Sequence, residues 1–269
     1  MPKNPVRLIV TDLDRTLLHT NKTISDYTAE VLHQCRLKDI KIVFATARPK
    51  RTVNHLAFIK NSLVDALILH NGAVTYIGEK MHTCFSISQT IRDDMLQSIA
   101  KNFPESKLSV EIDDVLYANF DVHSVWPETI STLTDFSDCK GLPDKPADKI
   151  IVGASSTAEL ERFAKYIPDT MYIEMTTGDS MNIGMVMNKA ASKWAGTQAI
   201  AAHFGISTAN TVAFGDDYND ITMIAGCAQS GGIGVAVSNA ISEVKAIAND
   251  LCDINDNDGV AKWLESNVL

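Results

Sequence analysis

Two aspartates, Asp12 and Asp14, follow a short apolar run and are separated by a single residue. The run, residues 8–10, is rich in β-branched side chains and too short for a helix, so it predicts a buried strand over 7–13. If the strand persists, both carboxylates point to the same side, about 6.6 Å apart along the backbone. At an effective dielectric of about 20, two such charges repel by roughly 2 to 2.5 kcal/mol. Unless the pair only caps a strand end and a turn, it needs a third partner: a hard cation, a shared proton or a nearby base.

Polar side chains also follow three later predicted strands. In an open parallel sheet, the carboxyl ends of the strands line the crevice where ligands bind. Any one of these groups could belong to an ordinary loop, but polar groups at four equivalent strand ends indicate a shared site. The later strands and their polar groups are 41–46 with Thr46 and Arg48, 66–69 with Asn71, and 211–214 with Asp216 and Asp220.

These side chains need a scaffold that brings the strand ends together. The N-terminal segments alternate between apolar strands and helices, which is typical of a parallel sheet with crossover helices. The same alternation returns after residue 188. We therefore predict an α/β fold with a Rossmann-like parallel-sheet core. The predicted elements are strand 7–13, helix 25–38, strand 41–46, a helix from 49 to about 60, strand 66–69, helix 189–204, strand 211–214, a helix to about 225, strand 233–237, helix 240–248, strand 251–254 and helix 259–266.

Between these halves the pattern changes to short segments of alternating hydrophobicity. We predict that residues 83–186 form an inserted α+β module with a largely antiparallel sheet, and that 1–82 and 187–269 form the core. The segment 123–145 has weak periodicity and predicts a loop. The other predicted elements are a hairpin over 74–88 around Gly78, helix 89–102, strands within 108–119, 149–152 and 171–175, and helix 157–166.

Composition limits the partners and the location of the protein. The chain has 269 residues and a formal net charge of −9, which argues against binding to nucleic acid or to an anionic membrane. Five cysteines without CxxC spacing favour free thiols in a reducing compartment, so we expect a cytoplasmic protein. The N-terminal apolar run is too short for a signal peptide. The uncharged stretches 194–215 and 221–242 are interrupted by polar residues and glycines, so they predict buried core rather than membrane spans.

The acidic residues suggest phosphoryl transfer. Asp12, Asp14 and Asp216 offer hard oxygen ligands, which suit Mg²⁺ better than zinc. A carboxylate can also act as a nucleophile and form an aspartyl phosphate. Phosphate monoesters hydrolyse so slowly unaided that catalysis needs charge neutralisation, in-line attack and an acid for the leaving oxygen. Asp12 would be the nucleophile and Asp14 the acid and then the base. Mg²⁺, Lys193 and the Thr46 hydroxyl would neutralise and bind the transferred group.

Four motifs in a fixed order resemble those of the haloacid dehalogenase superfamily, and within it the Cof-type phosphatases with a type IIB cap. Residues 12–16 (Asp-Leu-Asp-Arg-Thr) resemble DxDGT, and Thr46 lies in ATARP, which resembles ATGRP. Lys193 matches the motif lysine, and residues 215–220 match GDxxND. Later, 237–240 resembles MGNA and 258–261 resembles DGVA. The resemblance covers essentially the whole chain and implies the haloacid dehalogenase fold with a C2B-type cap at 83–186.

The resemblance also implies a role for each matching residue. Asp12 is implied to be the nucleophile and a metal ligand, and Asp14 the general acid/base with its backbone carbonyl on the metal. Thr46 and Lys193 are implied to bind the phosphoryl group. The remaining implied roles are Asp216 as a metal ligand, Asp220 as a ligand or the anchor of one, Asn219 as a phosphate contact, and Arg48 and Asn71 as residues that face the substrate.

The sequence departs from the family pattern at three positions. Arg15 replaces a glycine, and it could crowd or repel the metal or touch an anionic substrate. Ala47 and Trp194 replace glycines beside the second and third motifs. Because every reacting group is retained, we expect activity, but on an atypical substrate.

The function predicted from these motifs is a Mg²⁺-dependent phosphatase acting on a small phosphorylated metabolite, such as a sugar phosphate. The inserted module would act as a lid that excludes water and sets specificity. Two alternatives remain open. One is a phosphotransferase or phosphomutase on the same scaffold, and the other is a non-enzymatic module that binds phosphorylated metabolites.

Two other patterns in the chain are weaker. Residues 232–234 (Gly-Ile-Gly) lack the third glycine of a dinucleotide-binding motif and predict a turn into a strand. The acidic segment 253–259 resembles a calcium loop, but its glycine comes one place late and the twelfth position is Leu264. We therefore predict no calcium site there.

Overall fold

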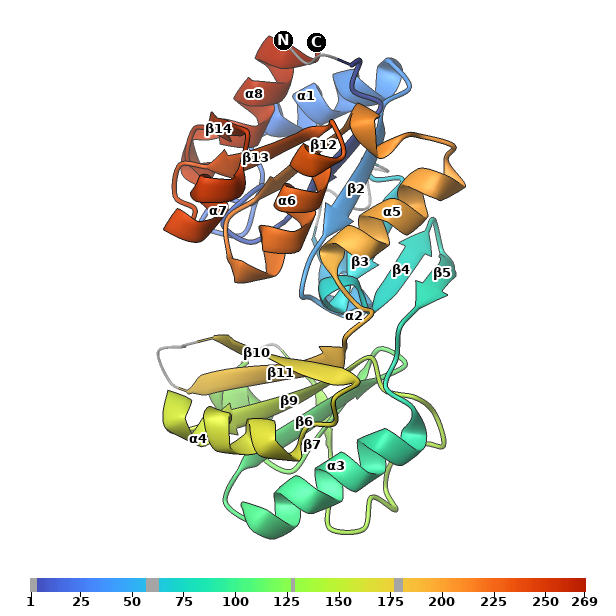
Figure 1. Ribbon diagram of the computed structural model, residues 1–269, viewed down its shortest axis with the longest axis vertical. Helices are drawn as coiled ribbons and strands as arrows, with labels where there is room; N and C mark the ends of the chain where they lie inside the picture. Colours follow the sequence, from blue (N-terminus) through green and yellow to red (C-terminus); the bar gives the residue numbers. More distant parts are fainter. Residues whose placement is uncertain (1–3, 57–62, 127–128, 177–180) are drawn as a thin grey trace. The chain divides into compact units, whose positions relative to one another are not determined.

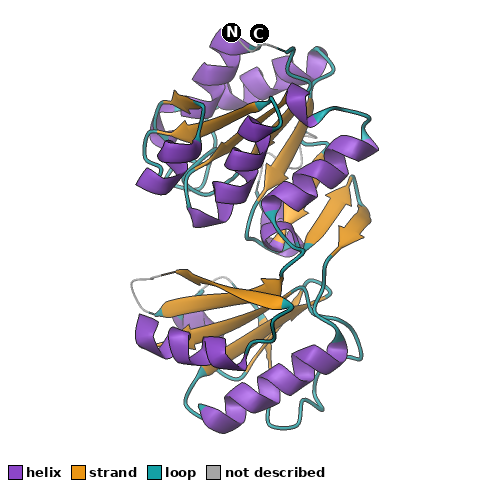
Figure 2. Cartoon of the chain, in the orientation of Figure 1, coloured by secondary structure: helices purple, strands orange, loops and turns teal. Residues whose placement is uncertain are grey.

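The computed structural model describes residues 4–56, 63–126, 129–176 and 181–269 (Figures 1 and 2). The chain divides into two compact units, Met1–Thr83 with Ala191–Leu269, and Cys84–Ala190. The first unit contains a mostly parallel sheet with helices on both faces, which confirms the predicted fold class. No helix in the described part of the chain is both long and apolar enough to cross a bilayer.

The sheet of the first unit has eight strands in the order β14-β13-β12-β1-β2-β3-β4-β5. β1 (Leu8–Thr11) lies between β12 (Thr211–Gly215) and β2 (Lys41–Ala45) and is parallel to both. The chain builds outward from β1 in one direction and later returns to build from β1 in the other. Strand order therefore reverses between β1 and β12, and the carboxyl ends at such a point border the ligand crevice. The other strands are β3 (Ala66–Leu69), β4 (Val74–Ile77), β5 (Lys80–Cys84), β13 (Ile233–Val237) and β14 (Asp250–Cys252).

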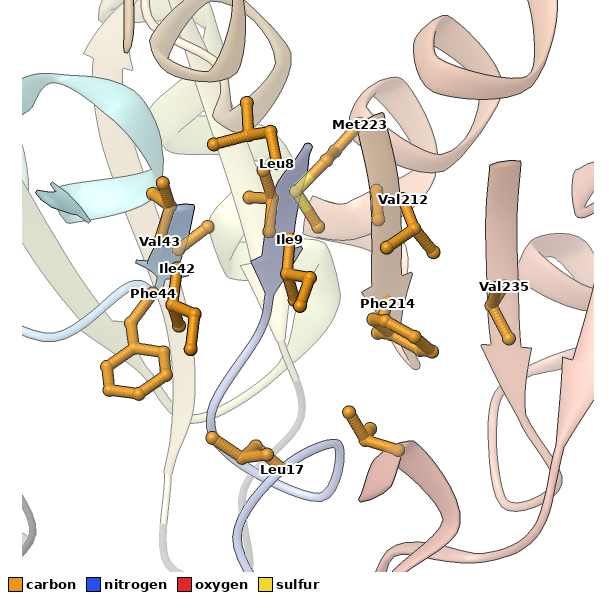
Figure 3. Close-up of a cluster of buried hydrophobic side chains, with 14 of the residues drawn as sticks. Leu8, Ile9, Leu17, Ile42, Val43, Phe44, Val212, Phe214, Met223 and Val235 are labelled. Carbon is orange, nitrogen blue, oxygen red and sulfur yellow. The ribbon is translucent and has the colours of Figure 1, made fainter. Parts of the chain in front are cut away.

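The central strands are buried on both faces, which explains their continuous apolar sequences. All four residues of β1 are buried. Ile9 pairs with Ile42 on one side and with Val212 on the other. Figure 3 shows these side chains packed together with Phe44 and Phe214 from the same strands. This packing fixes the strand ends from which the polar groups project.

Helices cover both faces of this sheet (Figure 1). α1 packs against α8, whereas α5 packs against α6. The predicted helix 189–204 begins four residues late, because the Ser192 side chain caps it by accepting from the Ala195 N–H. Only part of the predicted helix from 49 to about 60 is observed, and residues 57–62 lie outside the described ranges. The helices are α1 (Asp26–Leu37), α2 (Lys50–Asn54), α5 (Lys193–His203), α6 (Ile221–Gln229), α7 (Ser242–Ile247) and α8 (Gly259–Asn267).

The second unit contains a six-stranded sheet in the order β10-β11-β9-β6-β7-β8. Its pairings are antiparallel except between β7 and β8. β8 was missed because its three residues are largely exposed and too few to show a period. The elements are α3 (Gln89–Asn102), β6 (Lys107–Ile112), β7 (Val115–Ala118), β8 (Ser131–Leu133), β9 (Lys149–Ala154), α4 (Thr157–Phe163), β10 (Met171–Thr176) and β11 (Asn182–Asn188).

Asp148, just before β9, should make the stability of the second unit depend on pH. Burial raises the pKa of Asp148 to about 7, and the carboxylates of Glu111, Asp113 and Asp114 contribute to the increase. The folded chain therefore holds this proton more tightly than the unfolded chain, and stability falls as the pH rises from about 4 through about 7. We expect Asp148→Asn to raise the free energy of unfolding by about 2 kcal/mol at pH 8 and to change it little at pH 4.

Urea unfolding followed by circular dichroism at both pH values measures this difference. Asp169→Asn is the matched control, because it removes the same charge from an exposed position of the same unit. A gain for Asp148→Asn that is equal at both pH values would contradict the pKa assignment.

Candidate active site

Three buried carboxylates meet at the carboxyl ends of β1 and β12. One oxygen of each of Asp12, Asp216 and Asp220 lies within 4.8 Å of the other two. The buried Lys193 from α5 donates hydrogen bonds to Asp12 Oδ1 and to Asp220 Oδ1, both at 2.6 Å. In the described part of the chain, these three aspartates are the group of His, Cys, Asp and Glu side chains that could hold a metal ion. The sequence predicted all three, and the structure brings them together.

The Gly215–Asp220 turn holds Asp220 by its own backbone. Asp220 Oδ2 accepts hydrogen bonds from the N–H groups of Asp216 at 2.9 Å and Asp217 at 3.1 Å. Its side chain packs over Gly215, where an added Cβ would lie 2.5 Å from the Asp220 Cβ. Any side chain at position 215 would therefore displace Asp220. This contact explains why glycine and aspartate occur together in the motif.

Lys193 is positioned by a close contact between two turns. Gly72 has a φ of +98°, and a Cβ there would lie 2.0 Å from the Ser192 carbonyl oxygen. The turn after β3 can therefore press directly against the residue that caps α5. Because the helix is capped at Ser192, Lys193 occupies its first turn, and its ammonium group reaches Asp12 and Asp220.

The charges in this cluster are unbalanced. Burial raises the pKa of Asp12, and despite the opposing Lys193 ammonium, the neighbouring Asp220 and Asp216 help keep it well above its usual value. Burial also raises the pKa of Asp216 to about 7. Burial alone would lower the pKa of Lys193, but Asp12 and Asp220 outweigh it and raise the pKa, so the ammonium keeps its charge. When all three carboxylates are ionised, the buried Lys193 ammonium balances one of their negative charges, and a divalent cation would neutralise the other two. Three hard oxygen donors also suit Mg²⁺.

Asp14 has different partners from Asp12. The Arg48 guanidinium donates to both of its oxygens, with Nε–Oδ2 at 2.7 Å and Nη2–Oδ1 at 2.6 Å. Lys22 Nζ donates to Oδ1 at 2.8 Å. Burial would raise the pKa of Asp14, but these two cations hold it below its ordinary value. The two aspartates of the first motif therefore have different cationic partners, Lys193 for Asp12 and Arg48 with Lys22 for Asp14, which offset the repulsion expected from their spacing.

The two aspartates diverge because β1 ends before them. The strand stops at Thr11, and Arg15 has a φ of 62°, in the left-handed region. The chain therefore leaves the strand at Asp12 and turns at Leu13, before Asp14. The expectation that both carboxylates point to the same side required a strand that continues to residue 13. β1 ends at Thr11, so this requirement is not met. The side chain of Asp14 lies outside the three-carboxylate cluster, and the backbone ligand role implied for it remains a prediction.

Thr46, Asn71 and Asn219 form a second group beside the cluster. Thr46 is buried, its hydroxyl accepts from the Arg48 N–H at 3.2 Å, and its carbonyl accepts from the Asn71 N–H at 3.1 Å. The Asn219 side-chain amide donates to Asn71 Oδ1 at 3.1 Å. Asn71 has a φ of 55°, a left-handed conformation that asparagine tolerates well. The predicted phosphoryl-binding and substrate-facing residues therefore come from strand ends that the fold brings together.

Several contacts of the site were not predicted, among them the ion pair of Arg48 with Asp14. Thr16 Oγ1 donates to Asp216 Oδ1 at 2.9 Å and so links the first motif to the fourth. Its place in the first motif was the available signal. Lys22 pairs with Asp14, and we find no signal for this in the sequence, since the contact depends on how a polar loop folds.

Comparison with known proteins now identifies the fold family. The model of the haloacid dehalogenase-like hydrolases matches residues 9–264. The chain belongs to this family. The predicted family and the predicted enzyme class, a phosphatase of the haloacid dehalogenase type, are thereby confirmed.

Several haloacid dehalogenase relatives match over nearly their full length. The 5-amino-6-(5-phospho-D-ribitylamino)uracil phosphatase YitU of Bacillus subtilis is 26% identical over 271 residues, which cover 96% of each chain. The pyridoxal phosphate phosphatase YbhA of Escherichia coli is 25% identical and covers 98% of this chain and 99% of its own. Among solved structures, a sugar phosphatase of haloacid dehalogenase subclass IIB superposes with a TM-score of 0.82 at 25% identity, covering 97% of this chain and 98% of the other.

Proposed function

We propose that the protein is a Mg²⁺-dependent phosphatase that hydrolyses a small phosphorylated metabolite through a phosphoryl group carried on Asp12. The observation that carries this proposal is the buried cluster of Asp12, Asp216 and Asp220 around Lys193. Asp12 and Asp216 would hold the ion together with the Asp14 carbonyl, and Asp220 would orient Lys193. When bound, Mg²⁺ would neutralise the phosphoryl oxygens and balance the buried carboxylates.

The residues of the chain would carry out two successive displacements. In the first, a carboxylate oxygen of Asp12 bonds to phosphorus, the ester P–O bond breaks, and the leaving oxygen takes a proton from Asp14. In the second, Asp14 takes a proton from water as the water oxygen bonds to phosphorus, and the bond between phosphorus and Asp12 breaks. The Lys193 ammonium and the Thr46 hydroxyl would bind the phosphoryl oxygens throughout.

The pairing of Asp14 with Arg48 represents the base form of Asp14 rather than its acid form. Both oxygens of Asp14 accept charge-assisted bonds, so protonation requires that Arg48 move away. A second acidic group on the substrate would attract the guanidinium. We therefore propose that Arg48 exchanges Asp14 for the substrate when the substrate binds.

The relatives support a small phosphorylated metabolite as the substrate. Their names describe phosphatases of a phosphorylated ribitylaminouracil and of pyridoxal phosphate, and one structural neighbour is a sugar phosphatase. We propose a sugar phosphate or a similar metabolite for this chain, with the unit Cys84–Ala190 as a cap domain that sets specificity. Five free cysteines support our proposal of a cytoplasmic location.

Release of inorganic phosphate tests the proposal. Purified protein is assayed first with p-nitrophenyl phosphate, with Mg²⁺ and with EDTA, and then with a panel of sugar phosphates, nucleotides and vitamin phosphates. We expect Mg²⁺-dependent phosphate release and a preferred substrate within the panel. Formation of an isomer or a transfer product instead would favour a phosphomutase or phosphotransferase. Binding without turnover would favour a non-catalytic module.

Arg15 should weaken metal binding if Asp216 is a ligand. Its Nε lies 3.8 Å from Asp216 Oδ2, and its side chain is 59% exposed. An ion pair this exposed is worth up to about 1 kcal/mol. We therefore expect Arg15→Gly to tighten Mg²⁺ binding by up to about fivefold, measured by isothermal titration calorimetry. Arg15→Lys, which keeps the charge, is the control. Weaker Mg²⁺ binding by Arg15→Gly would show that Arg15 does not compete with the ion.

A further inference from the structure

The turn that follows Asp14 is held by two asparagines from the far end of the chain. Asn239 Nδ2 donates to the Arg15 carbonyl at 2.7 Å. Asn255 Nδ2 donates to the Leu18 carbonyl at 2.8 Å, and this bond is buried. The Asn255 backbone N–H in turn donates to Asn239 Oδ1 at 3.1 Å. The two amides therefore form one connected clamp on the backbone of residues 15–18.

The rest of the acidic segment 253–259 contacts the residues that follow, in the loop and at the start of α1. Asp258 Oδ1 accepts from Ser25 Oγ at 2.7 Å and from Thr28 Oγ1 at 2.8 Å. Asp256 accepts from the N–H and the hydroxyl of Thr20, both at 2.6 Å. A calcium loop would use these carboxylate oxygens as ligands. Here they accept hydrogen bonds from other residues of the chain. The segment that resembled a calcium loop is instead where the loop after the first motif is attached.

The turn of residues 15–18 contacts the acidic cluster directly. Thr16, between the two clamped carbonyls, donates its hydroxyl to Asp216 Oδ1 at 2.9 Å. The Leu18 N–H donates a hydrogen bond to the Leu13 carbonyl at 2.8 Å. This bond closes the turn at Leu13, the residue between Asp12 and Asp14. Arg15 holds a left-handed conformation that a non-glycine residue rarely adopts, and its carbonyl is the group that Asn239 holds. A turn of this kind persists only where its surroundings enforce it.

We propose that Asn239 and Asn255 are positioning residues that fix the 15–18 turn and thereby set the affinity of the acidic cluster for its cation. This inference rests on the proposed function, because it assumes that Asp12 and Asp216 bind Mg²⁺. Neither asparagine contacts the reacting atoms in this role. They would orient the Thr16 hydroxyl and the backbone of Asp14. Residues that support metal ligands in this way commonly tune the affinity of a metal site.

The test uses a variant that removes a single donor. Asn239→Asp keeps an oxygen that can accept from the Asn255 N–H, loses the donor to the Arg15 carbonyl and adds a negative charge, which by itself would favour cation binding. We expect it to weaken Mg²⁺ binding about 10-fold in isothermal titration calorimetry. We also expect faster hydrogen exchange at the Leu18 amide, measured without metal. Asn239→Ala should behave alike, and Asn255→Ala should show the same effects if that buried site still folds.

Asp256→Ala is the matched control, because it cuts the attachment at Thr20 and leaves the clamp intact. We expect it to bind Mg²⁺ within about twofold of wild type. Wild-type affinity and wild-type Leu18 exchange in Asn239→Asp would overturn the inference. If the wild-type protein binds no Mg²⁺, the proposed function fails instead. The exchange measurement then still decides whether Asn239 holds the turn.

Discussion

Asp12→Asn is expected to reduce turnover by on the order of 10⁴-fold or more, because an amide cannot form the phosphoryl–enzyme bond. The change keeps the shape of the side chain, and the amide oxygen can still accept the bond from Lys193 Nζ that Asp12 Oδ1 accepts at 2.6 Å. It also removes one negative charge from a cluster of three buried carboxylates, of which Lys193 bonds Asp12 and Asp220. We therefore expect the free energy of unfolding to be unchanged or increased. Steady-state assays with Mg²⁺ and urea unfolding separate the two effects.

Asp217→Asn is the matched control for this experiment. Asp217 lies beside the cluster, and its side chain accepts from the Tyr218 N–H at 2.8 Å at the start of the next turn. The substitution removes the same charge one residue away from Asp216. Activity within a few-fold of wild type is expected. If Asp12→Asn retained activity comparable to this control, Asp12 would not be the nucleophile.

Lys193→Met is expected to impair both activity and stability. Lys193 is 1% exposed and lies between Asp12 and Asp220, so its removal leaves two buried carboxylates without their cation. Removing one partner of a buried ion pair commonly costs about 3 to 5 kcal/mol. We expect a loss of that size in metal-free protein and a fall in kcat of about 10²-fold or more, since an electrostatic group is lost at the phosphoryl site.

Mg²⁺ should partly restore the stability of Lys193→Met, because a divalent cation can take over some of the neutralisation. Thermal unfolding with EDTA and with Mg²⁺ measures this recovery. Lys189→Met is the control, since it makes the same change at an exposed position shortly before α5. Equal stability losses for the two variants would contradict the account of Lys193 as the cation that balances the cluster.

The strand-end residues could be predicted from local sequence. Asp12, Thr46 and Asp216 each follow an apolar run, and parallel strands place such residues at one edge of a sheet. Lys193 could not be found in this way, because nothing in the sequence of α5 marks one face as functional. Its direction depends on the close approach of Gly72 to Ser192, which is a tertiary contact. The match to the family motif was needed to single it out.

The partners of Asp14 were also beyond local reasoning. Arg48 comes from the end of the neighbouring strand, so its proximity could be expected from the fold. Its pairing with Asp14 instead of a ligand could not, because it depends on where the chain turns after Thr11. Lys22 lies in a polar loop without periodicity. The spacing of two carboxylates indicated that cations were needed, but it did not identify which ones.

The most direct test of the central claim is to locate the phosphoryl group on the protein. The enzyme is mixed with substrate and Mg²⁺, quenched within milliseconds and treated with borohydride, which reduces an aspartyl phosphate to homoserine. Peptide mass spectrometry then identifies the modified position. The account predicts homoserine at position 12 with Mg²⁺ and its loss with EDTA. Modification at Asp14 or Asp216 under conditions of active turnover, or none at position 12, would contradict it.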